Sequence, residues 1–382
     1  MAIIVTALVA LLAIVGGALF PAGRTFYRLQ QENRGLQYTA DSSCKLVQDP
    51  LLRGCENGAL HAASGQVFFA CAVDLETRSK WFPPAHLLDR EAAKEPKGAI
   101  VVLDLKTTKA RKLDLHNFTP SFHTFGIGIA PSRSDPKSII ISAVNVGLDG
   151  NSIETFTHKI GDKHATHVNT FRDEKLLHSP NDVVPIDEDS FYATNDRSKA
   201  AVGSLAWGIV GNLGWSKAAT VVYKGKDGKA RVVADKFTLA NGITTSADQK
   251  HVYVVDTMAA IVNVYERRHN NGLRLRDTIE VPVLGDNVAV DGSTGAIYVS
   301  GVIDIMGCLK DIPMKSPCLS GVVKVTNNTG SDQLYGKKFN ADVVHTEFDR
   351  VVPAGIAAVD HHLKKSFVAG WHGGVVVCDK VF

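Results

Sequence analysis

The stretch HSPNDVVPIDEDSFYATND, residues 178–196, contains the pattern that decides the fold. A Ser-Pro-Asn-Asp turn leads into the apolar pair Val183-Val184, a second turn follows at Asp187–Asp189, and the run Phe191–Thr194 ends the stretch. Short apolar runs bounded by turn residues are typical of β-hairpins. We therefore expect a hairpin here, with an amide and a carboxylate at the mouth of its first strand.

The same pattern recurs along the whole chain. Its six copies are anchored at Asn57, Gly126, Asp182, Gly242, Asn287 and Gly355, with spacings of 45 to 69 residues. Six hairpins at this spacing predict an all-β, six-bladed β-propeller. A doubly wound fold is not favoured, because it would need long amphipathic helices between the strands.

The repeat also sets the domain organisation of the 382-residue chain. We divide it into a leader at residues 1–23, a polar stalk at 24–43 and one propeller at 44–382. Residues 2–20 are apolar except for Thr6, about the length that crosses a bilayer, so the leader is a secretory signal peptide or a signal anchor. The basic residues Arg24 and Arg28 after it would, by the positive-inside rule, favour a cytosolic body.

The cysteines and two glycosylation sequons favour the secretory pathway instead, for a secreted or membrane-anchored protein. The chain has six cysteines, and the sequons begin at Asn117 and Asn327. Cys44 and Cys378 lie at opposite ends of the repeat, where a propeller must join its terminal strands. We therefore expect a disulfide between them, contributing roughly 4–5 kcal/mol at most in the chain-entropy model.

The other four cysteines leave several pairings open. Cys55 and Cys71 flank the first hairpin and could pair across it, and Cys308 and Cys318 could staple the loop between them. Buried thiols are the alternative.

Charge excludes one class of partner, and one apolar segment suggests another. The net charge is only +3, and no Lys/Arg run is interleaved with aromatic residues, so we expect no nucleic-acid binding. Residues 200–217, AAVGSLAWGIVGNLGWSK, are nearly uncharged and contain Trp207 and Trp215. We expect this segment, like residues 1–20, to contact a membrane or to fold over the propeller face. An ordinary outer strand is the alternative.

The turns that open the repeats carry oxygen ligands. In a propeller the first strand of each blade lines the central channel, so equivalent turns converge there. Two carboxylates and three amides occupy these turns: Glu56, Asp286, Asn181, Asn241 and Asn287. Hard oxygen ligands with two negative charges suit Ca²⁺, whereas the imidazole and thiolate that Zn²⁺ prefers are missing. We therefore expect one Ca²⁺ at this end of the channel.

Several motifs resemble the serum paraoxonase/arylesterase family, which consists of calcium-dependent, six-bladed propeller hydrolases. They are PND and FYATND within Leu177–Asp196, ANG within Leu239–Gly242, GDNVAV at Gly285–Val290, and the terminal cysteine pair. The resemblance covers roughly residues 44–378. It implies that the five residues named above hold a catalytic Ca²⁺.

The resemblance also implies a second, structural Ca²⁺. Its ligands would be Asp182, the backbone carbonyl of Ile127 and an aspartate where this chain has Asn57. Because Asn57 lacks a negative charge, we predict that this second ion binds weakly or not at all.

The family's pair of catalytic histidines is not conserved in this chain. Phe125 in FHTFGI and Val146 in VNVG stand at the corresponding positions. His123 is two residues from Phe125, on the same face if the segment is a strand, and is a candidate substitute. A core or surface histidine is the alternative.

These patterns lead to a hypothesis with two alternatives. We expect a Ca²⁺-dependent hydrolase of small apolar lactones or aryl esters, in which Glu56, Asp286 or His123 activates water. The loss of both family histidines favours, as an alternative, a non-hydrolytic cyclase or isomerase on the same propeller. A non-catalytic, ligand-binding propeller is the third reading.

Overall fold

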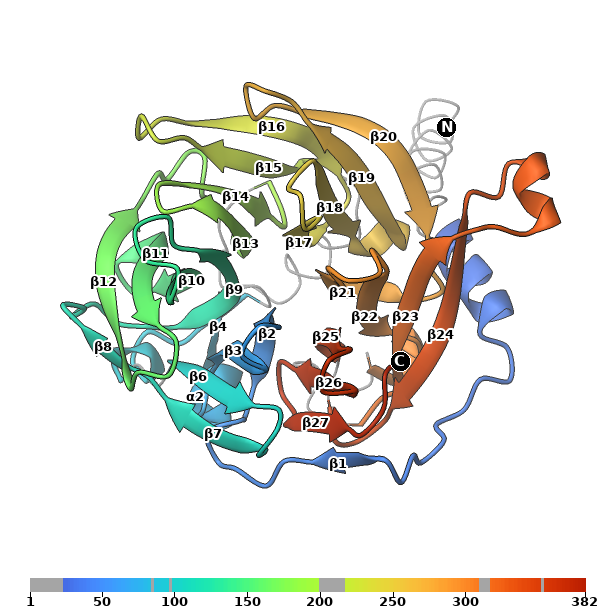
Figure 1. The fold of residues 1–382 in the computed structure, drawn as a ribbon, viewed down its shortest axis with the longest axis horizontal. Coiled ribbons are helices and arrows are strands. Elements are labelled where there is room, and N and C mark those ends of the chain that lie inside the picture. Colours follow the sequence, from blue (N-terminus) through green and yellow to red (C-terminus); the bar gives the residue numbers. More distant parts are fainter. Residues whose placement is uncertain (1–22, 84–85, 96–97, 199–216, 309–316, 352–353) are drawn as a thin grey trace, which may run out of the picture.

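Six sheets surround a central channel in the part of the chain that the structure describes (Figure 1). The computed structural model describes residues 23–83, 86–95, 98–198, 217–308, 317–351 and 354–382. In each sheet the innermost strand is followed outward by the next strands of the chain, and β8 and β1 are added at the rim of two of the sheets. The predicted six-bladed β-propeller is therefore confirmed.

The blades follow one another in chain order. Blade 1 contains β2 (Cys55–His61), β3 (Gln66–Cys71), β6 (Ala99–Asp104) and β7 (Lys109–Lys112). Blade 2 contains β9 (Thr124–Pro131), β10 (Ser138–Gly147), β11 (Gly150–Lys159) and β12 (His164–Phe171), with β8 (Asp114–His116) parallel to β12. Blade 3 contains β13 (Pro180–Asp187), β14 (Ser190–Asn195), β15 (Ala219–Lys224) and β16 (Ala230–Phe237).

The last three blades are built in the same way. Blade 4 contains β17 (Ala240–Thr245), β18 (His251–Asp256), β19 (Ile261–Arg267) and β20 (Leu273–Glu280). Blade 5 contains β21 (Leu284–Val290), β22 (Ile297–Val302), β23 (Ser320–Asn327) and β24 (Phe339–Glu347). Blade 6 contains β25 (Ala354–Asp360), β26 (Lys365–Gly370), β27 (Val375–Cys378) and β1 (Cys44–Leu46).

Short elements connect these strands. Between β3 and β6 lie α2 (Leu75–Lys80), β4 (Trp81–Phe82), β5 (Leu87–Leu88) and η2 (Ala92–Lys94). The remaining elements are η3 (Thr257–Ala259), α4 (Ile305–Cys308) and η4 (Ser331–Tyr335).

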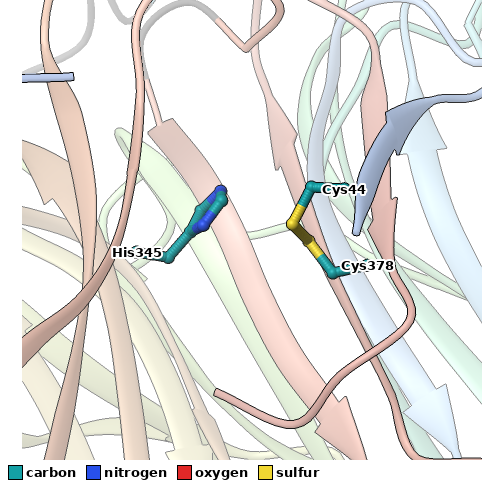
Figure 2. A group of neighbouring side chains, drawn as sticks. All are labelled: Cys44, His345 and Cys378. Carbon is teal, nitrogen blue, oxygen red and sulfur yellow. A yellow bond between two sulfur atoms is a disulfide. The ribbon is translucent and has the colours of Figure 1, made fainter. Parts of the chain in front are cut away.

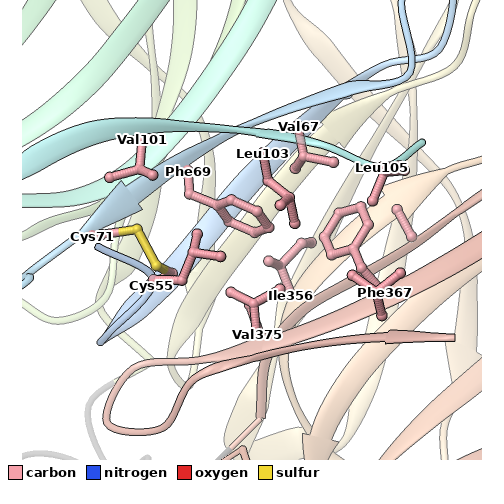
Figure 3. Packing of buried hydrophobic residues seen from close by; sticks show 14 of the residues in the cluster. Cys55, Val67, Phe69, Cys71, Val101, Leu103, Leu105, Ile356, Phe367 and Val375 are labelled. Carbon is pink, nitrogen blue, oxygen red and sulfur yellow. A yellow bond between two sulfur atoms is a disulfide. The ribbon is translucent and has the colours of Figure 1, made fainter. Parts of the chain in front are cut away.

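The core lies between adjacent blades. Middle strands such as β6, AIVVLD, are almost fully buried because both of their faces pack on neighbouring blades, whereas β20 at the rim is largely exposed. Figure 3 shows one such interface, in which Phe69 of blade 1 meets Phe367 of blade 6 edge to face at 5.3 Å. Burial between blades explains why the sequence shows apolar runs instead of strict alternation.

A strand from each end of the propeller closes the ring. β1 pairs with β27 in antiparallel register, with Cys44 opposite Cys378, and a disulfide joins the two residues. The predicted closure is confirmed, and the structure also pairs Cys55 with Cys71 and Cys308 with Cys318.

Figure 2 shows His345 beside the closing disulfide. Its Nε2 lies 2.8 Å from Glu347 Oε1, and its ring stacks on Phe382. Because both neighbouring cysteines are oxidised, this group is a structural contact and not a metal site.

Residues 24–43, the predicted stalk, include most of a helix at 23–32 that packs on the propeller. Leu29 is buried against Ala260 and Leu284, and Arg28 donates to the carbonyl of Ala260 at 3.0 Å. No helix among the described residues is long and apolar enough to cross a membrane. Residues 1–22 and 199–216, with Trp207 and Trp215, lie outside the described residues, so the predicted leader and membrane contacts stay predictions.

Candidate active site

The predicted cation ligands lie near the starts of the inner strands, at one end of the channel. Glu56, Asn181 and Asn241 are each the second residue of their strand, and Asp286-Asn287 begin two residues into β21. At this point the pairing of each inner strand with the next strand shifts register, as between Cys55 and Asn57 and between Gly285 and Val288. A β-bulge re-aims side chains. The bulges therefore allow neighbouring residues such as Asp286 and Asn287 both to serve the same site.

Glycines bring the inner strands of adjacent blades together at this end. A Cβ on Gly126 would lie 2.4 Å from the carbonyl oxygen of Asn181, and one on Gly242 would lie 2.6 Å from Cα of Asn287. At Gly355 the carbonyl oxygen of Glu56 would be 2.2 Å away. These contacts are shorter than real Cβ atoms allow, so only glycine permits the approach.

Hydrogen bonds connect the ligands across blades. Asn287 Nδ2 donates to Glu56 Oε1 at 2.8 Å and to the Glu56 backbone carbonyl at 3.2 Å. Asn241 Nδ2 donates to Thr257 Oγ1 at 3.2 Å, and, against the larger effect of desolvation, the side chain of Asn241 also lowers the pKa of Asp286. The structure thus brings together residues that are up to 231 positions apart in the sequence.

Three oxygens of this group have no hydrogen-bond partner. They are Glu56 Oε2, Asn181 Oδ1 and Asn241 Oδ1, and all three are buried. An unpaired buried acceptor is costly unless a cation or an ordered water binds it. Three of them on three blades, all from predicted Ca²⁺ ligands, fit a hard cation with oxygen ligands.

The electrostatics of the site agree with this fit. Desolvation, together with the charges of Asp286 and Asp182, raises the pKa of Glu56 well above its usual value. Desolvation also raises the pKa of Asp286, although this residue is partly exposed. It raises the pKa of Asp182 to about 7. Carboxylates that resist ionisation together are stabilised in the charged form by a bound cation.

The residues implied for a second ion do not fit one equally well. The carboxylate of Asp182 accepts hydrogen bonds from the backbone N–H of Ile243 at 2.8 Å and of Val183 at 2.7 Å, and from Ile127 and Asn57. Asn57 Nδ2 also donates to Asn287 Oδ1 at 3.2 Å. The amide of Asn57 therefore donates hydrogen bonds to oxygens that a second cation would otherwise bind.

Phe125 and Val146, the two positions that the resemblance implies for the family's histidines, belong to an apolar cluster. Phe125 and Val146 are buried with Phe82 and Trp371. The rings of Phe82 and Trp371 stack at 5.0 Å, and Phe82 meets Phe125 edge to face at 5.3 Å. No side chain in this cluster can accept the proton of an attacking water, because the indole N–H of Trp371 is a hydrogen-bond donor only.

His123 lies just before β9, and its ring is held by the backbone. Its Nε2 lies 2.9 Å from the carbonyl of Ala93, so Nε2 carries the proton and Nδ1 remains an acceptor. Burial lowers the pKa of His123, so the ring is neutral at pH 7. It lines a cavity of about 20 Å³ with Arg78, Trp81 and Thr124, whose buried hydroxyl has no partner. The cavity has room for one water.

Sequence reasoning missed Arg78, which lies on α2 beside the site. Its guanidinium is buried over the rings of Phe82 and Phe125, at 5.0 and 5.8 Å from their centroids. Burial lowers its pKa to about 10, so it is still charged at pH 7. The one sequence signal is an arginine three residues before the aromatic pair Trp81-Phe82.

A larger cavity lies beside the start of β13. It has a volume of about 280 Å³ and reaches Ser179 and Pro180, directly before Asn181. Trp81, Leu88 and Val146 contribute apolar walls. Because the lining also includes the charged residues Arg90, Asp196 and Arg197, the cavity suits a small molecule that has both apolar and polar groups.

Comparison with known proteins gives the family. Residues 90–337 match the family model described as Arylesterase. The chain is 30% identical to serum paraoxonase/arylesterase 2 of Rattus norvegicus over 75% of its length and 78% of the relative. It belongs to the serum paraoxonase/arylesterase family. It is also 31% identical to serum paraoxonase/arylesterase 1 of Mus musculus, over 65% of this chain and 67% of that one.

Solved structures share the propeller fold with this family member. A luciferin-regenerating enzyme has a TM-score of 0.53 at 13% identity and covers 87% of this chain and 94% of its own. XC5397 from Xanthomonas campestris, described as a gluconolactonase, has a TM-score of 0.50 at 15% identity, covering 87% and 88%. At such identities these likenesses support the fold alone.

Proposed function

We propose that this paraoxonase/arylesterase family member is a Ca²⁺-dependent hydrolase that cleaves lactones or aryl esters. Membership of the family supports a propeller hydrolase. The observation that carries calcium is the set of three unpartnered, buried oxygens at Glu56, Asn181 and Asn241.

The residues divide the work as follows. Glu56, Asn181, Asn241, Asp286 and Asn287 would hold the ion, and Asn287 fixes the carboxylate of Glu56 through Oε1 so that Oε2 faces the site. A bound calcium ion would polarise the substrate carbonyl and stabilise the oxyanion. A second, structural ion at Asn57, Asp182 and Ile127 belongs to the proposal only as a weak site.

Water activation is assigned to a carboxylate or to His123. Glu56 and Asp286 are carboxylates of the cluster, and with the ion bound either of them would be ionised and able to accept a proton from a water in the site. His123 offers a neutral imidazole with Nδ1 as acceptor. Phe125 and Val146 offer no such group, so this chain needs a base other than the family's histidines.

The cavity beside Asn181 would hold the substrate. Its walls at Trp81, Leu88 and Val146 favour an apolar acyl or leaving group, and its volume of about 280 Å³ favours a small one.

We also propose that the protein is made in the secretory pathway. All six cysteines form disulfides, which are rare in reducing compartments. The sequon residues Asn117 and Asn327 are exposed and accessible for glycosylation.

The decisive experiment combines metal content with hydrolysis. Purified protein should contain calcium, hydrolyse members of a lactone and aryl-ester panel, and lose activity with chelator. Glu56→Gln should lower activity about a hundredfold. Glu91→Gln, at an exposed ion pair with Lys94, is the matched control and should leave activity unchanged. Absence of hydrolysis by calcium-loaded protein would refute the proposal.

A non-hydrolytic cyclase or isomerase is the second candidate, favoured by the apolar cluster at Phe125 and Val146. Product analysis in ¹⁸O-labelled water separates the two activities, because only hydrolysis inserts solvent oxygen. If calcium removal lowers stability and no substrate is converted, a non-catalytic ligand-binding propeller is the better description.

A further inference from the structure

Arg78 carries a buried positive charge, and its hydrogen bonds to the protein are long. Its side chain is 6% exposed, and Nη2 donates to the backbone carbonyls of Gly54 at 3.3 Å and Thr124 at 3.4 Å. Among the described residues, no carboxylate lies within ion-pair distance of it. Keeping a guanidinium in such a place costs free energy unless a nearby charge compensates it.

The negative charge that compensates Arg78 is that of Glu56 on β2. Gly54 is two residues before Glu56, and Thr124 begins β9 of the adjacent blade, so the guanidinium spans the joint between blades 1 and 2 at the end where the ligands gather. Glu56 and Arg78 interact electrostatically through the protein interior. The guanidinium also packs over the rings of Phe82 and Phe125.

The charges of the cluster then have a simple balance. Glu56, Asp182 and Asp286 are three carboxylates that interact with one another. When all three carboxylates are ionised, the charge of Arg78, which acts on Glu56, offsets one of them and leaves two net negative charges, which one divalent cation neutralises. Without Arg78 the same oxygens would present three negative charges and would favour a trivalent ion.

We propose that Arg78 is a positioning residue that sets the charge of the cation site, so that it is matched to one divalent ion. This inference rests on the proposed function for the place of the ion. Because Arg78 offsets one carboxylate, a divalent ion in the site retains more of its charge for the substrate carbonyl.

Two variants separate charge from packing. Arg78→Met removes the charge and keeps an unbranched side chain over the rings, whereas Arg78→Lys keeps the charge. Affinities for Tb³⁺ and Ca²⁺ are measured by calorimetry on the full-length, chelator-treated protein. We expect Arg78→Met to raise the ratio of Tb³⁺ to Ca²⁺ affinity by about tenfold or more, and Arg78→Lys to leave it within about twofold.

An unchanged ratio in Arg78→Met, or an equal change in Arg78→Lys, would overturn the inference. If Arg78→Met does not fold, Arg78→Gln replaces it, because its amide can still donate to the carbonyls of Gly54 and Thr124. The same ratio then decides.

Hydrolysis provides a second, independent readout. In Arg78→Met, kcat should fall about tenfold while Ca²⁺ binding does not weaken, which a purely structural defect would not produce. If the affinity ratio shifts and the wild type hydrolyses nothing, the proposed function fails and the role of Arg78 stands. If hydrolysis is normal and the ratio does not shift, only the role of Arg78 fails.

Discussion

At the scale of single residues, Gly242 decides how close two blades can come. Because Gly242 has no Cβ, there is room beside it for Cα of Asn287 and the backbone carbonyl of Asp286. Both residues are cation ligands in our proposal. Gly242→Ala should therefore cost about 1–3 kcal/mol of unfolding free energy and weaken Ca²⁺ binding. Denaturant unfolding and calorimetry test both effects.

The control for this substitution is Gly292→Ala. Its Cβ would lie 3.6 Å from the nearest atom, Cβ of Ala247, which is an ordinary contact. Equal losses in both variants would mean that the close approach at Gly242 does not matter.

Asn57 is the residue that distinguishes one ion from two. Its amide donates to Asp182 and Asn287, so we expect Asn57→Asp to exchange these donors for a charge and to raise the calcium content of the protein by one ion. Calorimetric stoichiometry checks this, with Asn340→Asp, at a half-buried position on the rim strand β24, as control. An unchanged stoichiometry in Asn57→Asp would contradict the expectation.

At the scale of elements, the starts of the inner strands β2, β13 and β21 hold three carboxylates that destabilise one another when charged. Desolvation raises the folded-state pKa of Asp182 from 3.8 to about 7, and those of Glu56 and Asp286 also rise. A raised carboxyl pKa means that the folded state binds more protons than the unfolded state. Stability of the metal-free protein should therefore fall as pH rises from about 4 through 7.

Thermal unfolding with excess chelator tests this directly. We expect a Tm several degrees lower at pH 8 than at pH 5.5, and a much smaller difference with saturating calcium, because the ion neutralises the carboxylates. A Tm that rises with pH in chelator would show that these carboxylates are not strained.

At the scale of the whole molecule, the ring is held by one strand taken from the N-terminal end. The Cys44–Cys378 disulfide closes a separation of 334 residues, against 10 for Cys308–Cys318. In the chain-entropy model the longer loop contributes about 5 kcal/mol and the shorter about 3 kcal/mol. Replacing both cysteines of the terminal pair with serine should therefore lower the unfolding free energy more than replacing the other pair.

Denaturant unfolding of the two double variants measures the difference. The Cys308/Cys318 variant serves as the comparison, since it also loses one disulfide. Equal destabilisation would indicate that closure of the ring depends on the pairing of β1 with β27 and not on the covalent bond.

The spacing of the hairpins was enough to predict the ring and its terminal disulfide, because each blade repeats a local pattern of apolar strand and polar turn. The same reasoning predicted that the polar turn residues lie together, since equivalent turns of a propeller converge. These residues are Glu56, Asn181, Asn241, Asp286 and Asn287. In a repeat protein, the place of a residue within its own repeat therefore predicts which distant residues lie near it.

The tertiary structure alone decided which charges and donors surround these ligands. Arg78 comes from a short helix inserted between β3 and β6, outside the repeat, and nothing in the sequence around it shows that its charge acts on Glu56. The hydrogen bonds of Asn57 to Asp182 and Asn287 likewise depend on a register shift in β2. The sequence by itself determined the ring and the residues at its mouth, because both follow from a repeated local pattern. Their electrostatic balance was decided by contacts between blades, because charge interactions depend on distances that no single repeat fixes.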